Sequence, residues 1–382
     1  MKGIGYQEKI TIGSREFQIH TGNNPNKNVI STEVFESGRF IFTAFEYYDE
    51  RIPENDTSDD EYLKSVTYET HQTIIDDIKL LFIINDKLKG VKQYLPHYRL
   101  GKIFYAKGFY EESIGNFKEA IAQKPDFIRG MKRLGLAYLA AGHLNDAVEI
   151  FQNAHNLKNK YPDILNLLGV ALTQVGEYER ATKYLQNAID IKSDYMEANF
   201  NLGIVLFLST VRDSSEKGNV VIPARVLRFF KAMKDHQRYQ SDPWKIKFEQ
   251  ALESIQSGKK NKIIQALAKI QLDIATIEES NEMMDFFLLK FMYGGKELTN
   301  DELEYFEKLV KDEVEAHPMY ADYWNELGVI HLIQCRDYFL KSINEFENAV
   351  KINPQLEIAK ENHDLLKKNK NGFLILLRAI LR

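Results

Sequence analysis

Apolar and polar residues alternate over most of the first fifty or so positions, a spacing typical of strands with one buried face. The alternating segments are residues 9–12, 16–20, 29–35 and 40–45. Two turn-forming sequences separate them in pairs, Gly13-Ser14-Arg15 and Glu36-Ser37-Gly38-Arg39. A meander of this size can bury one face only if another element covers it. The pattern therefore predicts a small antiparallel β-meander within residues 1–57.

After position 58 the apolar spacing changes to three and four residues, which indicates an amphipathic helix. Ser58 and Glu61 match a capping box at its start, and Gly90 follows its end. We predict a linking and capping helix over 58–90 that covers both the meander and the first of the repeats that follow. The acidic residues of 49–61 predict a solvated connector, and an acidic docking site is the alternative.

A fixed interval organises the next part of the chain. Leucine-glycine pairs recur every 34 residues, with their glycines at Gly101, Gly135, Gly169 and Gly203. Self-similarity at such a period is the signature of a repeat array, in which each unit packs on its neighbours. Further glycines follow seven residues after the first three, at Gly108, Gly142 and Gly176. Glycine accepts the left-handed backbone of a tight turn, so this second set predicts turns inside the repeats.

Other positions recur in the same register. In the first repeat, 94–127, they are Phe104, Ser113, Phe117, Ala120 and Pro125. With the leucine-glycine pairs, these residues give the chain a pattern that resembles the tetratricopeptide repeat (TPR). The resemblance implies pairs of antiparallel helices that cross at the small residues. It also implies that the first helix of each repeat lines a concave groove, and that this groove binds a protein or peptide.

The repeat pattern is regular over 91–208, weakens after Leu208 and returns near the C-terminus. Helices are expected at about 243–257, 261–279, 282–293 and 300–316, which predicts degenerate helical hairpins within 209–320. A further repeat at 321–356 contains Leu327-Gly328 and has two additional residues near Cys335–Tyr338, where we expect its hairpin turn. Residues 357–382 predict a capping helix and an apolar C-terminal tail. The predicted fold is mainly α, a TPR-type α-solenoid of antiparallel helix pairs with the small β-meander at its N-terminus.

Composition narrows the class of protein and its partners. Of the 382 residues, 44% are hydrophobic and 27% charged, a balance typical of a folded chain. The net charge of -5 provides no basic field for nucleic acid, so we expect no nucleic-acid partner. A single cysteine cannot form a disulfide within the chain, and no secretory signal precedes the meander. We therefore expect a cytoplasmic protein, with an oligomeric state that the sequence leaves open.

Catalytic and metal-binding patterns are not evident in the sequence. There is no phosphate-binding loop, no dinucleotide-binding glycine pattern after a strand and no Cys-x-x-Cys pair. His331 and Cys335 are four residues apart on a predicted helix, the spacing of a possible dyad, but we assign them to aromatic packing and to the hairpin turn. We predict no enzyme activity, no cofactor and no metal site. An enzyme with its site in the N-terminal meander is the least favoured alternative.

The resemblance to the TPR family identifies the groove positions, and these are the predicted partner-binding residues. They are Tyr98, Lys102, Tyr105, Arg129, Lys132, Asn166, Thr173, Gln174, Phe200 and Phe207. Aromatic and basic side chains can anchor a peptide while polar ones hold its backbone. We predict a non-enzymatic scaffold or adaptor that binds a peptide or helix of a partner protein in this groove.

An alternative assigns the chain to a membrane surface. Basic residues recur every three positions from Arg225 to Lys234, beside apolar ones, which indicates a basic amphipathic helix within 222–236. This helix and the apolar tail at 372–382 could attach a peripheral membrane assembly factor. We nonetheless rank this alternative below the adaptor. An ordinary surface helix, with one charged face in solvent and one apolar face in the core, has the same pattern of residues.

Overall fold

The computed structural model describes residues 4–24, 27–48, 58–157, 161–212, 222–276, 282–295, 299–316, 318–319 and 321–381. The acidic connector at 49–57 and the polar segment at 213–221 lie outside these residues, as do the side chains at 58–60 that would form the capping box. The chain forms two compact units. One comprises residues 1–99 and 281–382, and the other comprises residues 100–280.

The N-terminal strands form the predicted antiparallel meander. Strands β1 (Gly5–Ile12), β2 (Arg15–Asn24), β3 (Val29–Glu36) and β4 (Arg39–Tyr47) pair in the order β1-β2-β3-β4. The turn after β1 has a positive φ of 62° at Gly13, and the turn after β3 has one of 80° at Gly38. Glycine adopts these angles without strain, which explains why the alternating segments reverse at these positions.

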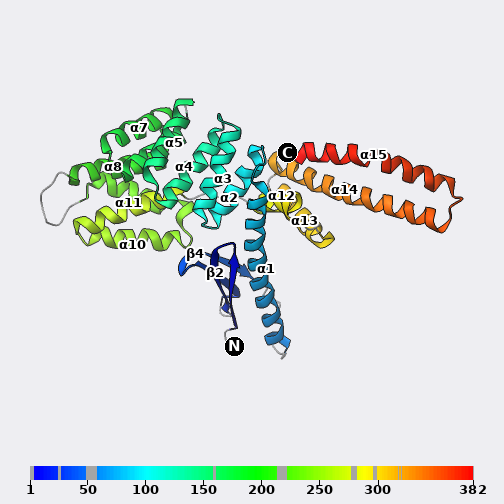
Figure 1. Ribbon diagram of the computed structural model, residues 1–382. Coiled ribbons are helices and arrows are strands. Elements are labelled where there is room, and N and C mark those ends of the chain that lie inside the picture. Colours follow the sequence, from blue (N-terminus) through cyan, green and yellow to red (C-terminus); the bar gives the residue numbers. More distant parts are fainter. Residues whose placement is uncertain are drawn as a thin grey trace. The chain divides into compact units, whose positions relative to one another are not determined.

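Helix α1 (Ser58–Leu88) covers one face of the meander, which confirms that part of the prediction (Figure 1). The covered face carries buried apolar side chains such as Phe17, Ile19 and Val34. A polar contact crosses the same interface, because Nδ1 of the buried His71 lies 2.8 Å from the hydroxyl oxygen of Thr21. The sheet therefore gains its core from a helix about fifty residues further along the chain.

This buried imidazole is expected to make the meander sensitive to acid. Burial lowers the pKa of His71, against a smaller opposite effect of Glu8. The unfolded chain then binds a proton at His71 at higher pH than the folded chain, so stability is present above about pH 6.5 and is lost below it. We expect the opening free energy of the β2 amides, measured by hydrogen exchange, to be lower at about pH 5.5 than at about pH 7.5.

The matched variants for this prediction are H71Q and, at an exposed position, H143Q. The decrease in opening free energy on acidification should be smaller in H71Q, because glutamine stays neutral at both pH values. It should persist in H143Q. An unchanged pH dependence in H71Q would assign the effect to other groups.

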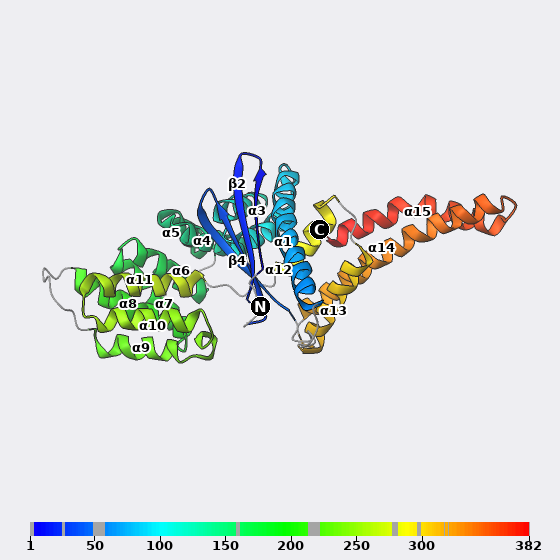
Figure 2. The same cartoon turned by 90° about the horizontal axis from the view of Figure 1, so that it is seen from below.

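The same unit contains the C-terminal helices α12 (Glu282–Tyr293), α13 (Asn300–Ala316), α14 (Ala321–Ile352) and α15 (Glu357–Leu381). Helix α12 packs on α1, and Nζ of Lys87 donates to the carbonyl oxygen of Tyr293 at 2.8 Å. Helices α14 and α15 run antiparallel to each other in both views (Figures 1 and 2). The rings of Phe339 and Phe373 stack between them with centroids 4.7 Å apart.

The hairpin turn expected at Cys335–Tyr338 is absent, because α14 continues through these residues without a break. The physical reason is the lack of a turn glycine. Gly108, Gly142 and Gly176 all have φ values between 74° and 84°, whereas Arg336 and Asp337 occupy the corresponding stretch of α14. Residues with a Cβ avoid such angles, so the helix continues. The partner of α14 is instead α15.

The packing role expected for His331 is also wrong. Its side chain is exposed, and Nε2 lies 3.5 Å from Oε1 of Glu307 on α13. Cys335 is exposed as well. Without the hairpin turn, this face of α14 does not close on a second helix of the same repeat.

The unit at residues 100–280 contains the regular repeats. Its helices are the second half of α2 (Tyr94–Ala106), α3 (Tyr110–Gln123), α4 (Ile128–Ala141), α5 (Leu144–Leu157), α6 (Pro162–Gln174), α7 (Tyr178–Ile191) and α8 (Met196–Arg212). The glycines of the leucine-glycine pairs lie at the helix crossings, as predicted. A Cβ built at Gly135 would lie 2.4 Å from the ring of Phe151, and one at Gly169 would lie 2.5 Å from Leu185. The absence of a side chain thus sets the distance between paired helices.

Three further helices complete this unit: α9 (Ala224–Lys234), α10 (Trp244–Gln256) and α11 (Lys260–Thr276), with a short 3₁₀ helix η1 (Gln237–Tyr239) after α9. Helix α9 packs on α8 and serves as its second helix, since a Cβ at Gly203 would lie 3.3 Å from Phe229. The helices predicted at 243–257, 282–293 and 300–316 are confirmed, and so is the described part of the one at 261–279.

Candidate binding site on the first helices of the repeats

Helices α4, α6 and α8 are the first helices of three successive repeats, and together they form what we call the first-helix face. Helix α11 packs on all three (Figures 1 and 2). Its apolar side is buried: Ile263, Leu267, Ile270 and Ile274 belong to one cluster that includes Phe200 and Phe207 of α8 as well as residues of α9 and α10. A segment of the chain itself therefore occupies much of the surface that the sequence predicts as a peptide groove.

Polar side chains of the predicted groove also bind α11. The hydroxyl of Tyr105 donates to the carbonyl oxygen of Thr276 at 2.7 Å, and Nε2 of Gln174 donates to the carbonyl oxygen of Ala268 at 3.1 Å. The same amide lies 3.2 Å from Oε1 of the buried Gln271. Burial raises the pKa of Tyr105, so its phenol stays protonated as the donor. These contacts replace those that we expected a partner to make.

The other predicted site residues are spread over several environments. Tyr98 and Lys102 lie on α2 and are partly exposed, while Arg129 at the start of α4 is exposed. Thr173 is buried and donates to the carbonyl oxygen of Gly169 within its own helix. Lys132 and Asn166 line one open cavity, and that cavity is the candidate binding site.

The cavity lies on the part of the first-helix face that α11 leaves open, and it has a volume of about 310 Å³. We call it the first-helix pocket. Its walls come from α4, α6, α8, η1 and the end of α11. It is lined by Lys132, Leu136, Asp163, Asn166, Leu167, Tyr195, Glu197, Asn201, Arg238, Ile274 and Ala275.

Two amides form the centre of the first-helix pocket. Nδ2 of Asn201 donates to Oδ1 of Asn166 at 2.8 Å, and both side chains are at least nine-tenths buried. The remaining oxygen of the Asn201 amide is buried and accepts no hydrogen bond from the described residues. Buried polar atoms are normally paired, so this oxygen is an acceptor whose donor is missing from the described residues.

Charged and phenolic groups surround the amides. Nζ of Lys132 lies 2.9 Å from Oδ2 of Asp163, and Nη1 of Arg238 lies 3.9 Å from Oε1 of Glu197. Burial raises the pKa of Tyr195, and the neighbouring carboxylates of Glu197 and Asp163 raise it further. The phenol therefore stays protonated and can donate. The two cations and two anions balance, so the pocket has a polar lining without a net charge.

Several pocket residues were not among the predicted ones, namely Asp163, Tyr195, Glu197, Asn201 and Arg238. Asp163 and Glu197 stand at the second position of their repeats, which the 34-residue register assigns to the groove. Asn201 directly precedes the Leu202-Gly203 pair, where a buried amide stands out among apolar neighbours. Arg238 comes from the irregular segment after α9, where no periodic signal exists.

Within the described residues, no group of three or more histidine, cysteine, aspartate or glutamate side chains is arranged to hold a metal ion. In the same part of the chain, no helix has the length and apolar character required to cross a bilayer.

Comparison with known proteins decides the nature of the repeats. Sequence profiles described as tetratricopeptide repeat match residues 98–162 and residues 138–198, the region in which the paired helices cross at glycine. The chain contains tetratricopeptide repeats. This confirms the resemblance drawn from the leucine-glycine pairs. No match was found among curated protein sequences.

Solved structures of TPR proteins are similar to parts of the chain at low identity. The first TPR domain of Spaghetti (RPAP3), bound to an HSP90 peptide, has 19% identity and a TM-score of 0.30, and the match covers 32% of this chain and 94% of that one. YrrB, a TPR protein with an unusual peptide-binding site, has 15% identity and a TM-score of 0.31, covering 50% and 95%. PilF of Pseudomonas aeruginosa has 16% identity and a TM-score of 0.32, covering 63% and 96%.

Proposed function

We propose that this TPR protein is a non-enzymatic adaptor whose first-helix pocket binds a peptide segment of a partner protein. The repeats belong to a family of interaction modules, which supports a protein-interaction scaffold. The single cysteine remains the ground for expecting a cytoplasmic location.

The observation that carries the proposal is the acceptor left open at Asn201. A buried carbonyl oxygen without a donor costs about 1–3 kcal/mol of desolvation that a ligand N–H can recover. Oδ1 of Asn166 already accepts a hydrogen bond from Nδ2 of Asn201, and this bond holds the Asn201 amide in one orientation. The backbone N–H of a peptide is a donor of the required kind.

The charge pattern of the pocket favours the same class of ligand. Lys132 and Asp163 already pair with each other, and Arg238 lies beside Glu197. A free phosphate or carboxylate would face as many anions as cations there. A peptide backbone carries donors and acceptors side by side, which matches the mixed lining. The apolar wall formed by Ile274 and Ala275 of α11 can take a small side chain.

The alternative attachment to membranes is less favoured by the geometry of α9. Its apolar residues Val226, Phe230 and Met233 are buried in the core cluster with α10 and α11. The guanidinium groups of Arg225 and Arg228 lie 5.7 Å and 5.6 Å from the centroid of the Phe229 ring. An interfacial helix binds by inserting its apolar face, and here that face is already used inside the protein.

The test begins with peptides selected on the full-length chain from a random peptide display library. We expect the variant N201L to weaken the selected peptides about tenfold, because it removes the open acceptor. Isothermal titration calorimetry measures the affinity, and thermal unfolding checks that the variant is folded.

A matched pair of charge changes locates the binding surface. K132Q alters a pocket side chain, whereas R129Q removes one positive charge from an exposed position on the same helix. The proposal requires weaker binding in K132Q and unchanged binding in R129Q. Selected peptides that bind N201L and K132Q as tightly as the wild type would place the binding site elsewhere.

A further inference from the structure

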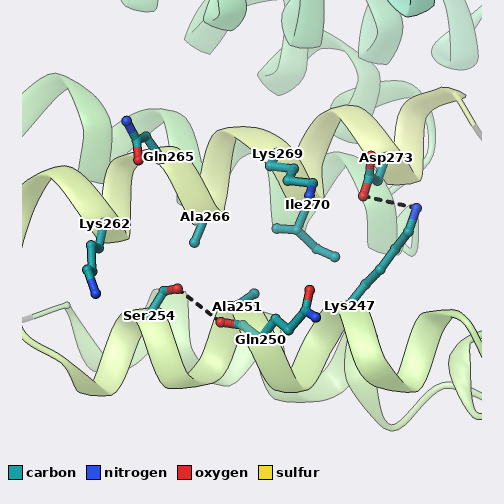
Figure 3. A pocket seen from close by; sticks show the side chains of 10 residues that line it. All are labelled: Lys247, Gln250, Ala251, Ser254, Lys262, Gln265, Ala266, Lys269, Ile270 and Asp273. Carbon is teal, nitrogen blue, oxygen red and sulfur yellow. Dashed lines mark hydrogen bonds and ion pairs between the residues drawn. The ribbon is translucent and has the colours of Figure 1, made fainter. Parts of the chain in front are cut away.

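A second cavity lies between α10 and α11, with a volume of about 340 Å³ (Figure 3). We call it the α10–α11 trough. Its lining residues come from these two helices alone: Lys247, Gln250, Ala251, Ser254, Lys262, Gln265, Ala266, Lys269, Ile270 and Asp273. None of them lines the first-helix pocket, which meets α11 at Ile274 and Ala275.

The trough exists because small residues meet where the two helices face each other. Ala251 of α10 and Ala266 of α11 form its floor with Ile270, while longer side chains stand along both rims (Figure 3). The apolar floor and polar rims are typical of surfaces that bind a segment of chain. From Lys262 to Asp273 the wall spans twelve residues of helix, or roughly 16 Å, enough for about five residues of extended peptide.

The lining carries an excess of positive charge. It contains three lysines and a single acidic residue, Asp273. Nζ of Lys247 lies 3.0 Å from Oδ2 of this aspartate, so one lysine is already paired. Lys262 and Lys269 are exposed and form no ion pair with a described residue. Lys262 extends from α11 toward α10 in Figure 3.

We propose that the α10–α11 trough binds an acidic peptide segment of a partner protein through Lys262 and Lys269. The contact between Lys247 and Asp273 shows how a carboxylate is held at one end of the trough. The lining contains lysines and no arginine, so it offers a carboxylate point charges rather than a bidentate clamp. Ser254, Gln250 and Gln265 add polar groups for the peptide backbone.

This inference goes beyond the adaptor function proposed above, because it adds a second surface with a different ligand chemistry. The charges that line the first-helix pocket balance, whereas those that line the trough are mainly positive and favour an acidic ligand. The two surfaces lie in the same compact unit. They share no lining residue, so each can be altered in the full-length chain while the other serves as the reference.

The probe is a fluorescein-labelled peptide of about eight residues, roughly half of them glutamate, with a glutamine version as the reference peptide. We expect the full-length chain to bind the glutamate peptide, and to bind it more weakly as salt is raised from about 50 to 500 mM. The double variant K262Q/K269Q is expected to lose about tenfold in affinity by fluorescence anisotropy, as two exposed ion pairs allow.

The matched control is K245Q/K259Q, which removes the same charge from exposed lysines of this hairpin outside the trough. It should bind as the wild type does, and so should N201L. A third variant, A266M, fills the floor without a change in charge and should also weaken the peptide. Equal losses in both double variants, unchanged affinity in K262Q/K269Q, or no binding at all of the glutamate peptide would overturn the proposal.

Discussion

Replacement of Gly135 by alanine is expected to lower the free energy of unfolding of the repeat unit by about 1–3 kcal/mol. A Cβ at this position would lie 2.4 Å from two ring atoms of Phe151, which is 0% exposed. The ring cannot withdraw without moving its own neighbours, because protein interiors are close-packed. The loss is to be measured by urea unfolding of the full-length chain, followed by hydrogen exchange of the α4 and α5 amides.

Two other helical glycines provide the controls. A Cβ at Gly115 of α3 or at Gly328 of α14 would have no heavy atom within 4 Å. G115A and G328A are therefore expected to be neutral, or to stabilise by up to about 1 kcal/mol through better helix propensity. Destabilisation by G328A equal to that by G135A would mean that the repeat at 321–356 packs as the regular ones do, contrary to the structure.

Gly135 and Gly328 also show what the sequence can and cannot predict. Both follow leucine in the same repeat motif, yet only Gly135 lies at a crossing of paired helices. The difference arises seven residues later, where Gly142 turns the chain with a φ of 82° and α14 has no glycine to do so. Helix crossings were predictable wherever both glycines are present, because the local backbone then determines the hairpin.

Long-range packing was harder to predict from the sequence than local geometry. The apolar spacing of 261–279 predicts a helix, but nothing in that spacing tells which surface the helix covers. Besides the adjacent α10, it packs on α4, α6 and α8, and α4 lies more than a hundred residues earlier in the sequence. The sharing of one compact unit by residues 1–99 and 281–382 is equally invisible to periodicity. Lys132 and Asn166 were identified because the 34-residue register places them on the first-helix face.

Helix α11 covers much of the first-helix face, and truncation of one of its buried side chains is the second change for which we expect a large effect. Leu267 of α11 is fully buried in the cluster with Phe200 and Phe207. The variant L267A is expected to lose about 2–5 kcal/mol, as buried leucines do when truncated. The loss should appear as faster hydrogen exchange in α11 and at the amides of α4, α6 and α8. The control is Q265A on the exposed side of the same helix, which should exchange as the wild type does.

The same variant tests how the two proposed surfaces depend on α11. Ile274 and Ala275 of this helix form a wall of the first-helix pocket, while Lys262 and Lys269 form a rim of the α10–α11 trough. Loosening α11 should therefore weaken ligands of both surfaces together, whereas N201L and K262Q/K269Q each affect one. If α11 were only loosely attached, L267A would leave exchange in α4, α6 and α8 unchanged, and a partner could displace the helix. The buried isoleucines beside Leu267 argue for the opposite result, since removing three or four such side chains from the cluster would cost roughly 5–12 kcal/mol.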